Sequence, residues 1–155
     1  MATPSRTLLI VHHSPGATLP TMLDAVRTGA AADGITGVDI EPVPALDASS
    51  IQVREAAGII VGTPANLGYM SGALKHFFDT VYNDCLEHTT GMPWGMFVHG
   101  ESDTTGATTS IDRVVTGLQW QKVISDVTVI GELDGPATDR CWELGATVAA
   151  RVMER

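Results

Sequence analysis

The chain of 155 residues contains little cysteine, little positive charge and no long apolar run. Its two cysteines, Cys85 and Cys141, do not form a C-x-x-C pair, so we expect reduced thiols within helices and neither a disulfide nor a zinc site. Lysine and arginine number 9 against 18 aspartates and glutamates, a net charge of −9. No basic stripe is present, which makes nucleic acid and anionic membranes poor partners.

The longest apolar runs, residues 7–11 and 58–62, have the length of a strand. A bilayer span needs about 20 apolar residues, so no membrane-spanning helix is expected. The first six residues carry one arginine and lead into only a short apolar stretch, which is not a secretory signal, and the sequence therefore predicts a cytoplasmic protein. With 44% hydrophobic and 17% charged residues, the chain can bury a core, and its length predicts one domain over residues 1–155.

Aliphatic runs alternate with helical stripes along the whole chain. The expected strands are residues 7–11, 38–44, 58–62, 94–99 and 127–130. The expected helical stripes cover residues 19–30, 74–85, 111–118 and 141–152, with Ser71 capping the second. This alternation predicts an α/β protein with a doubly wound, five-stranded parallel sheet and helices on both faces. The second strand has one polar face and two prolines, so it should lie at an edge and give the order 2-1-3-4-5.

Three loops follow strands of this sheet and should meet at its carboxyl edge, where open α/β sheets bind ligands. Residues 12–18 offer hydroxyls, a glycine and a helix start without a lysine, a set that is typical of a site for a phosphate monoester. Residues 62–72 combine apolar and glycine residues that have no obvious core role and can lie against a planar ligand. Residues 99–106 are polar and can bond the rim of a heteroaromatic ring.

The segment G-T-P-A-N-L-G-Y-M-S-G-A-L-K-H-F-F-D at residues 62–79 resembles the pattern G-T-P-x-x-x-G-x-M-S-G-x-x-K-x-F-x-D of the flavodoxin-like superfamily. Within it, the chain is most similar to the flavodoxin-like NAD(P)H:quinone oxidoreductases and NADPH-dependent FMN reductases. The phosphate loop of that group, S-x-T-G-N-T, is matched by Ser14 and approximately by Thr18. The residues that depart from it are Pro15, Gly16, Ala17 and Leu19.

This resemblance implies a flavodoxin-like fold with FMN at the carboxyl edge. It assigns FMN contacts to three sets of residues: Ser14, Gly16, Thr18 and Leu19; Thr63, Pro64, Ala65, Asn66, Leu67, Gly68, Tyr69 and Met70; and His99, Gly100, Glu101, Asp103 and Gly106. No aromatic residue occurs between His99 and Gly106, so one face of the ring would be open to a donor and an acceptor.

The implied activity is transfer of reducing equivalents from NADH or NADPH through the flavin to a quinone or similar acceptor. The flavin performs the chemistry, so no catalytic side chain and no metal are required. Enzymes of that group associate as dimers or tetramers, so the resemblance also implies a homo-oligomer. Two alternatives stay open: an electron carrier of the flavodoxin type, and a flavodoxin-like binding module that has lost FMN.

Three other functions fit this sequence poorly. A phosphorylated receiver domain needs an aspartate at the end of the third strand and a lysine at the end of the fifth, where Thr63 and Gly131 stand. A serine hydrolase needs G-x-S-x-G, and neither residues 68–72 nor residues 100–104 have that spacing. The five histidines share no metal-ligand spacing.

Overall fold

The structure, a computed structural model, describes residues 5–155. Five main strands form one parallel sheet in the order β2, β1, β3, β5, β7: β1 (Arg6–His12), β2 (Val38–Pro44), β3 (Gly58–Asn66), β5 (Pro93–Gly100) and β7 (Val127–Ile130). The register pairs Leu8 with Ile40 and Ile10 with Ile60. The predicted order 2-1-3-4-5 is therefore confirmed, with the proline-containing β2 at an edge.

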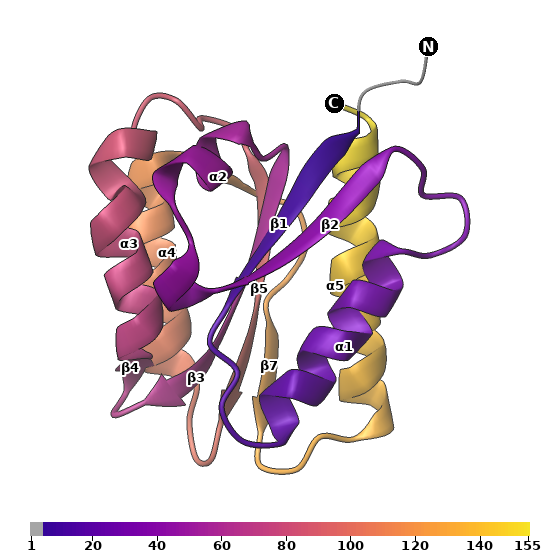
Figure 1. The fold of residues 1–155 in the computed structure, drawn as a ribbon. Helices are drawn as coiled ribbons and strands as arrows, with labels where there is room; N and C mark the ends of the chain where they lie inside the picture. Colours follow the sequence, from indigo (N-terminus) through magenta and orange to yellow (C-terminus); the bar gives the residue numbers. More distant parts are fainter. Residues whose placement is uncertain (1–4) are drawn as a thin grey trace.

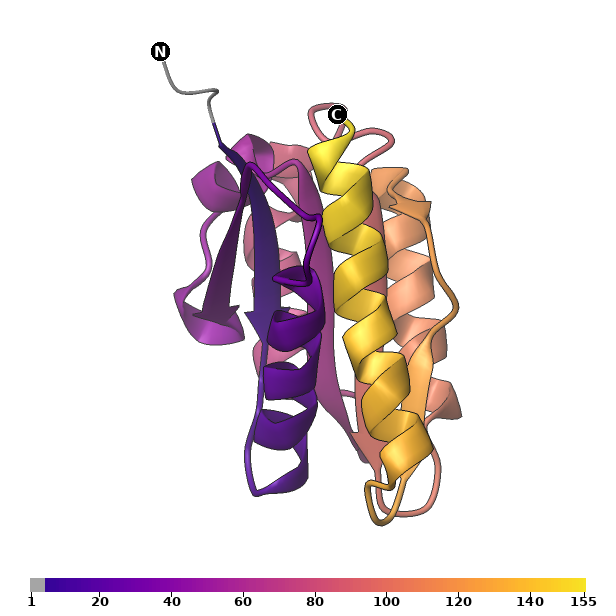
Figure 2. The ribbon, with the colours of Figure 1, turned by 90° about the vertical axis from the view of Figure 1, so that its right-hand side faces the viewer.

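Helices cover both faces of the sheet (Figures 1 and 2). On one face lie α1 (Thr18–Ala30) and α5 (Gly135–Met153), which pack side by side along Gly29 and Gly145. On the other lie α2 (Ser50–Glu55), α3 (Gly72–Cys85) and α4 (Thr105–Leu118). Alternate residues of the central strands supply the two cores: Leu9 and Val61 face α3 and α4, while Ile60 and others face α1 and α5.

Four short elements were not predicted. A 3-10 turn, η1 (Ala45–Asp47), and α2 follow β2. The two-residue strand β4 (Tyr69–Met70) pairs antiparallel with the end of β3, and β6 (Gln121–Lys122) pairs with the start of β5. The expected fifth strand, residues 127–130, is present as β7. The additional strand β6 pairs with the start of the same neighbour, β5, and residues 123–126 separate it from β7.

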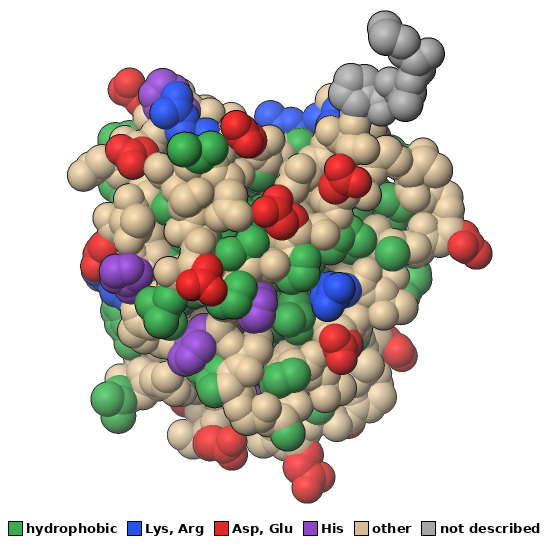
Figure 3. Space-filling view, in the orientation of Figure 1, with side chains coloured by type: hydrophobic (Ala, Val, Ile, Leu, Met, Phe, Trp, Pro, Cys, Tyr) green, Lys and Arg blue, Asp and Glu red, His purple; other side chains and the backbone are tan. Residues whose placement is uncertain are grey.

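Both cysteines are buried in helices and free, as expected. Trp94 and Trp120 are core residues, whereas Trp142 is 41% exposed on α5. Within residues 5–155, no helix is long and apolar enough to cross a bilayer. Acidic side chains project from the lower rim of the face seen in Figure 3, the end of the molecule at which the parallel strands finish.

Candidate functional site at the carboxyl edge

The three predicted loops meet beyond the carboxyl ends of β1, β3 and β5, at the lower end of the sheet in Figure 1. They enclose an open pocket of about 310 Å³. Its walls are Pro15, Gly16, Ala17, Thr18 and Leu19 from the first loop, Pro64, Ala65 and Asn66 from the second, and His99, Gly100 and Glu101 from the third. We call this space the edge pocket. Nine of the predicted cofactor contacts lie here: Gly16, Thr18, Leu19, Pro64, Ala65, Asn66, His99, Gly100 and Glu101.

The first turn of α1 closes one side of the edge pocket. Ala17 occupies the N-cap position and provides no capping side chain, and the first turn contains no acidic residue. Within the described residues, the amides of Thr18 and Leu19 have no hydrogen-bond acceptor. Three other helices are capped by Ser49, Ser71 and Asp134. The N-cap of α4, Thr104, gives no side-chain bond, but the amide of Thr105 donates to the Asp103 carboxylate. The positive end of α1 therefore remains available to an anion.

No lysine or arginine lines the edge pocket, so an anion there would be held by neutral donors. The available donors are backbone amides and the Thr18 hydroxyl. Glu101 contributes the only carboxylate among the lining residues of this pocket. This donor set fits a phosphate monoester in kind, because helix N-termini bind such groups through amides.

Ser14 lies on the other side of the first loop from the edge pocket. Its Oγ is 2.9 Å from Nδ1 of His12, and both residues face a separate cavity of about 420 Å³ bounded by the end of β2 and η1. Burial, His13 and Arg27, in that order, lower the pKa of His12. Ser14 thus does not line the edge pocket together with Gly16 and Thr18, although Pro15 lines both cavities, which adjoin at this residue.

The second loop is a β-hairpin. Leu67 and Gly68 connect β3 to β4 with φ angles of +51° and +72°, and the flanking residues Asn66 and Tyr69 pair across the hairpin. Two consecutive positive φ angles define a type I′ turn, which favours glycine at its second position. The Leu67 side chain is fully exposed at the tip. The sequence did not predict this hairpin, although a glycine between two extended runs is a known turn signal.

Thr63 and Met70 do not line the ligand surface, contrary to the prediction. The Thr63 hydroxyl donates to the carbonyl of Pro64 at 2.8 Å and accepts from the amide of Ser71 at 3.0 Å, which joins the two ends of the loop. Met70 is 2% exposed and packs in the core beneath α3 and α4. The expectation that apolar members of this loop lack a core role is therefore wrong for Met70.

The third loop is held by bonds at both of its ends. Nε2 of His99 lies 2.8 Å from the carbonyl oxygen of Gly131, which joins this loop to the one after β7. The Asp103 carboxylate accepts from the amide and the hydroxyl of Thr105, and these bonds lower the Asp103 pKa. Asp103 thus caps α4 instead of facing the edge pocket.

Tyr69 and Gly106 lie on the opposite side of the hairpin, contrary to the prediction of one continuous flavin site. They line a second pocket of about 300 Å³ between β4 and α4, together with Thr109, Ser110, Arg113 and Val114. We call it the β4–α4 pocket. A Cβ atom on Gly106 would lie 1.8 Å from the carbonyl oxygen of Gly68, so the hairpin tip rests directly on the first turn of α4. Arg113 was not predicted as a site residue, because its position on a helix gave no signal of its own.

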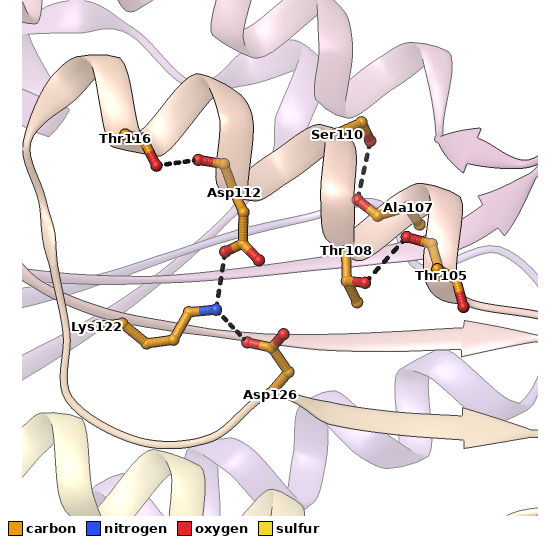
Figure 4. Close-up of polar contacts among 8 residues, drawn as sticks. All are labelled: Thr105, Ala107, Thr108, Ser110, Asp112, Thr116, Lys122 and Asp126. Atoms are coloured by element: carbon orange, nitrogen blue, oxygen red, sulfur yellow. Dashed lines mark hydrogen bonds and ion pairs between the residues drawn. The ribbon is translucent and has the colours of Figure 1, made fainter.

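Polar contacts hold α4 in place on both sides (Figure 4). The Ser110 hydroxyl donates to the carbonyl of Ala107 and accepts from the amide of Met70 at 3.3 Å, which attaches the hairpin to the helix. On another side, Lys122 pairs with Asp112 at 2.8 Å and with Asp126 at 2.7 Å, and its ammonium lies 5.1 Å from the Trp94 ring. These contacts hold α4, which forms one wall of the β4–α4 pocket.

Comparison with protein-family models gives no match, and comparison with curated protein sequences gives none either. Solved structures do match. A flavodoxin from the domain Archaea is 19% identical, with a TM-score of 0.78, and the alignment covers 94% of this chain and 98% of that one. A WrbA-like flavodoxin from Agrobacterium tumefaciens is 19% identical with a TM-score of 0.75, covering 97% and 98%. An oxidoreductase from Corynebacterium diphtheriae is 18% identical with a TM-score of 0.71, covering 98% and 97%. The chain has a flavodoxin-like fold.

Proposed function

We propose that this protein binds FMN in the edge pocket and passes reducing equivalents from NADH or NADPH to a quinone or similar acceptor. One observation carries the proposal: the first turn of α1 presents unbonded amides to a pocket at the carboxyl edge of a flavodoxin-like sheet. The volume of about 310 Å³ falls at the lower end of the range for small-molecule sites.

The residues divide by the part of FMN that each would hold. The amides of Thr18 and Leu19 and the Thr18 hydroxyl would bind the phosphate. Pro64, Ala65 and Asn66 on one wall and Gly100 on another would line the ring. FMN, when bound, accepts a hydride from a nicotinamide and returns two electrons to an acceptor. The net reaction takes one proton from solvent, so a quinone leaves as a hydroquinone while NAD(P)H becomes NAD(P)⁺.

The protein's own contribution is orientation. The bond from His99 to the Gly131 carbonyl and the clip between Thr63 and Ser71 fix two walls of the edge pocket before any ligand arrives. Prior fixing lowers the entropy that binding would otherwise cost. The third loop carries no aromatic residue between His99 and Gly106, which leaves room for a donor and an acceptor to approach and favours an enzyme over a carrier.

Ala17→Asp provides a sharp test of the phosphate site. An aspartate at the N-cap accepts from the free amides and should raise the free energy of unfolding by about 1 kcal/mol. The same carboxylate repels a phosphate, so the Kd for FMN should rise roughly tenfold or more. The Kd for riboflavin, which has no phosphate, should change far less. Ile51→Asp, at a site 66% exposed on α2, controls for the added charge.

Four results decide the proposal. Flavin absorption bands in the purified protein, or a Tm that rises with added FMN, support the cofactor site. A colourless protein whose Tm is unchanged by FMN overturns it, and a binding module without FMN is then the remaining function. Equal loss of FMN and riboflavin binding in Ala17→Asp places the phosphate elsewhere. If the protein with FMN oxidises NAD(P)H in the presence of a quinone no faster than free FMN does, the enzyme hypothesis is wrong and the electron carrier is the remaining function.

Two further predictions accompany this function. A homo-oligomer is expected, and light scattering of the purified protein measures its mass. A cytoplasmic location is also expected, and fractionation of cells that express the protein tests it.

A further inference from the structure

The β4–α4 pocket has the amino-acid composition of a small-molecule site. Tyr69 offers an aromatic side chain that is 41% exposed, and Val114 and the backbone of Gly106 add apolar surface. Thr109 and Ser110 supply hydroxyls, and Arg113 supplies a guanidinium. Mostly apolar walls with a few polar groups are the usual makeup of a ligand pocket.

Arg113 is a free cation in this pocket. Within residues 5–155, no carboxylate lies within ion-pair distance of its guanidinium. The acid next to it in the chain, Asp112, is paired with Lys122 (Figure 4). The nearby Lys75 is already paired with Asp79. None of the arginines in residues 5–155 forms an ion pair. Arg113 differs from the others in its position, because it lines a pocket beside the ring of Tyr69.

We propose that the β4–α4 pocket binds a planar organic anion, with Arg113 pairing the anionic group and Tyr69 lying against the ring. Arginine forms bidentate bonds to carboxylate and sulfonate oxygens, and a tyrosine ring gives a flat contact. The volume of about 300 Å³ accommodates one or two fused rings and is too small for a dinucleotide. The volume excludes NAD(P)H as the occupant. If the proposed function holds, the ligand would be the acceptor, held on the far side of the hairpin that lines the edge pocket.

The hairpin links this pocket to the edge pocket. Asn66 lines the edge pocket and its cross-strand partner Tyr69 lines the β4–α4 pocket, with only Leu67 and Gly68 between them. The bond from the Met70 amide to Ser110 and the contact of Gly68 with Gly106 fix the hairpin on α4. A ligand in one pocket thus lies one hairpin away from a ligand in the other.

The binding test uses two redox-inert probes of the same shape, 2-naphthoate and the neutral 2-naphthamide, in calorimetric titrations of the protein with and without FMN. We expect 2-naphthoate to bind about fivefold more tightly, and Arg113→Gln to abolish this difference. Arg113→Lys should restore part of it, and Tyr69→Leu should weaken both probes. Arg151→Gln, an exposed arginine on α5, should leave both unchanged. Equal binding of the two probes, or an unaltered Kd in Arg113→Gln, overturns the proposal.

A turnover test separates the site from the reaction. With 1,4-naphthoquinone-2-sulfonate as acceptor, Arg113→Gln should raise KM about fivefold with kcat unchanged, whereas the KM for neutral 1,4-naphthoquinone should not change. If FMN does not bind, the proposed function is wrong, but the dependence of 2-naphthoate binding on Arg113 can still be measured in the protein without FMN. Binding of 2-naphthoate that depends on Arg113 but does not compete with the sulfonated quinone overturns the assignment of this pocket to the acceptor.

Discussion

Leu67 is the residue whose replacement should stabilise the fold. It has a φ angle of +51° at the first position of the type I′ turn, and its side chain is fully exposed. A left-handed conformation costs a residue with a Cβ about 1–2 kcal/mol, whereas asparagine adopts it far more readily. Leu67→Asn removes no packing contact and should raise the free energy of unfolding by about 0.5–1 kcal/mol. For a chain of this size, 1 kcal/mol corresponds to a Tm increase of about 2–4 °C.

Thermal and urea unfolding of four variants measure this effect. Leu67→Ala keeps the strained φ angle without the isobutyl group, so its stability should stay near that of the parent. Leu67→Gly relieves the strain but makes the unfolded chain more flexible, which offsets the gain. Leu67→Val should destabilise, because a β-branched residue is least tolerant of positive φ. An unchanged or lower Tm for Leu67→Asn would refute the assignment of strain to this turn.

The same variant tests whether the exposed side chain serves a ligand. If Leu67 contacts the flavin ring, its loss should raise the Kd for FMN about tenfold, which corresponds to the apolar contact of one leucine. A variant that is more stable but binds FMN more weakly would show that the Leu67 side chain contributes to FMN binding at the expense of backbone strain in the turn. A more stable variant with an unchanged FMN Kd excludes Leu67 from the cofactor site.

Three further predictions concern the hairpin contact on α4, the Lys122 network and the two buried thiols. Gly106→Ala should lower the Tm and weaken probe binding beside α4, because the new methyl group would overlap the carbonyl of the hairpin tip; calorimetry measures both. Lys122→Met should lower the free energy of unfolding by about 1–2 kcal/mol in urea, since Asp126 loses its cation, and adding Asp126→Leu should recover part of the loss. Burial raises the pKa of Cys85 and Cys141 to about 11, so neither should react with Ellman's reagent at pH 8 before unfolding, and stability should fall as the pH rises from about 9 towards 11.

Each of these predictions has a matched control. Gly135→Ala adds a methyl group in open space and should leave the Tm unchanged or slightly higher. Lys75→Met removes an exposed pair that solvent screens, so it should cost less stability than Lys122→Met. An equal loss would contradict the role given to the Lys122 network. Thiol reactivity of the native protein at pH 8 would contradict burial. A double Cys→Ala variant that loses stability as steeply above pH 9 would assign the pH effect to other groups.

The main strands and long helices were predictable because their apolar periods are strong and local. Leu8 to Val11 form an unbroken aliphatic run that only a doubly covered strand can bury, and all four residues are fully buried. The short α2 was missed although its signal is present: Ser49 and Gln52 form a capping box, with Gln52 bonding the Ser49 amide at 2.9 Å. A helix of six residues buries one apolar residue, Val53, and therefore shows no stripe.

The grouping of the site residues was less predictable than their position at the carboxyl edge. Topology alone brings the three loops together, so Gly16, Asn66 and Gly100 could be placed at one edge from the strand order. The side of the hairpin on which each residue lies depends on two φ angles at its tip and on the contact of Gly68 with Gly106, neither of which has a periodic signature.

The same contact explains why a continuous stretch of sequence serves two pockets. A type I′ turn reverses the chain within two residues, so Tyr69 returns along β3 on the side of α4 instead of continuing across the edge pocket. The Ser110 hydroxyl then bonds the next amide and prevents the hairpin from swinging back. Residues that one motif places together are thereby divided between a pocket with free amides and a pocket with a free guanidinium. The two proposals require this division, because one assigns a phosphate group to the free amides and the other assigns a different anion to the guanidinium on the far side of the hairpin.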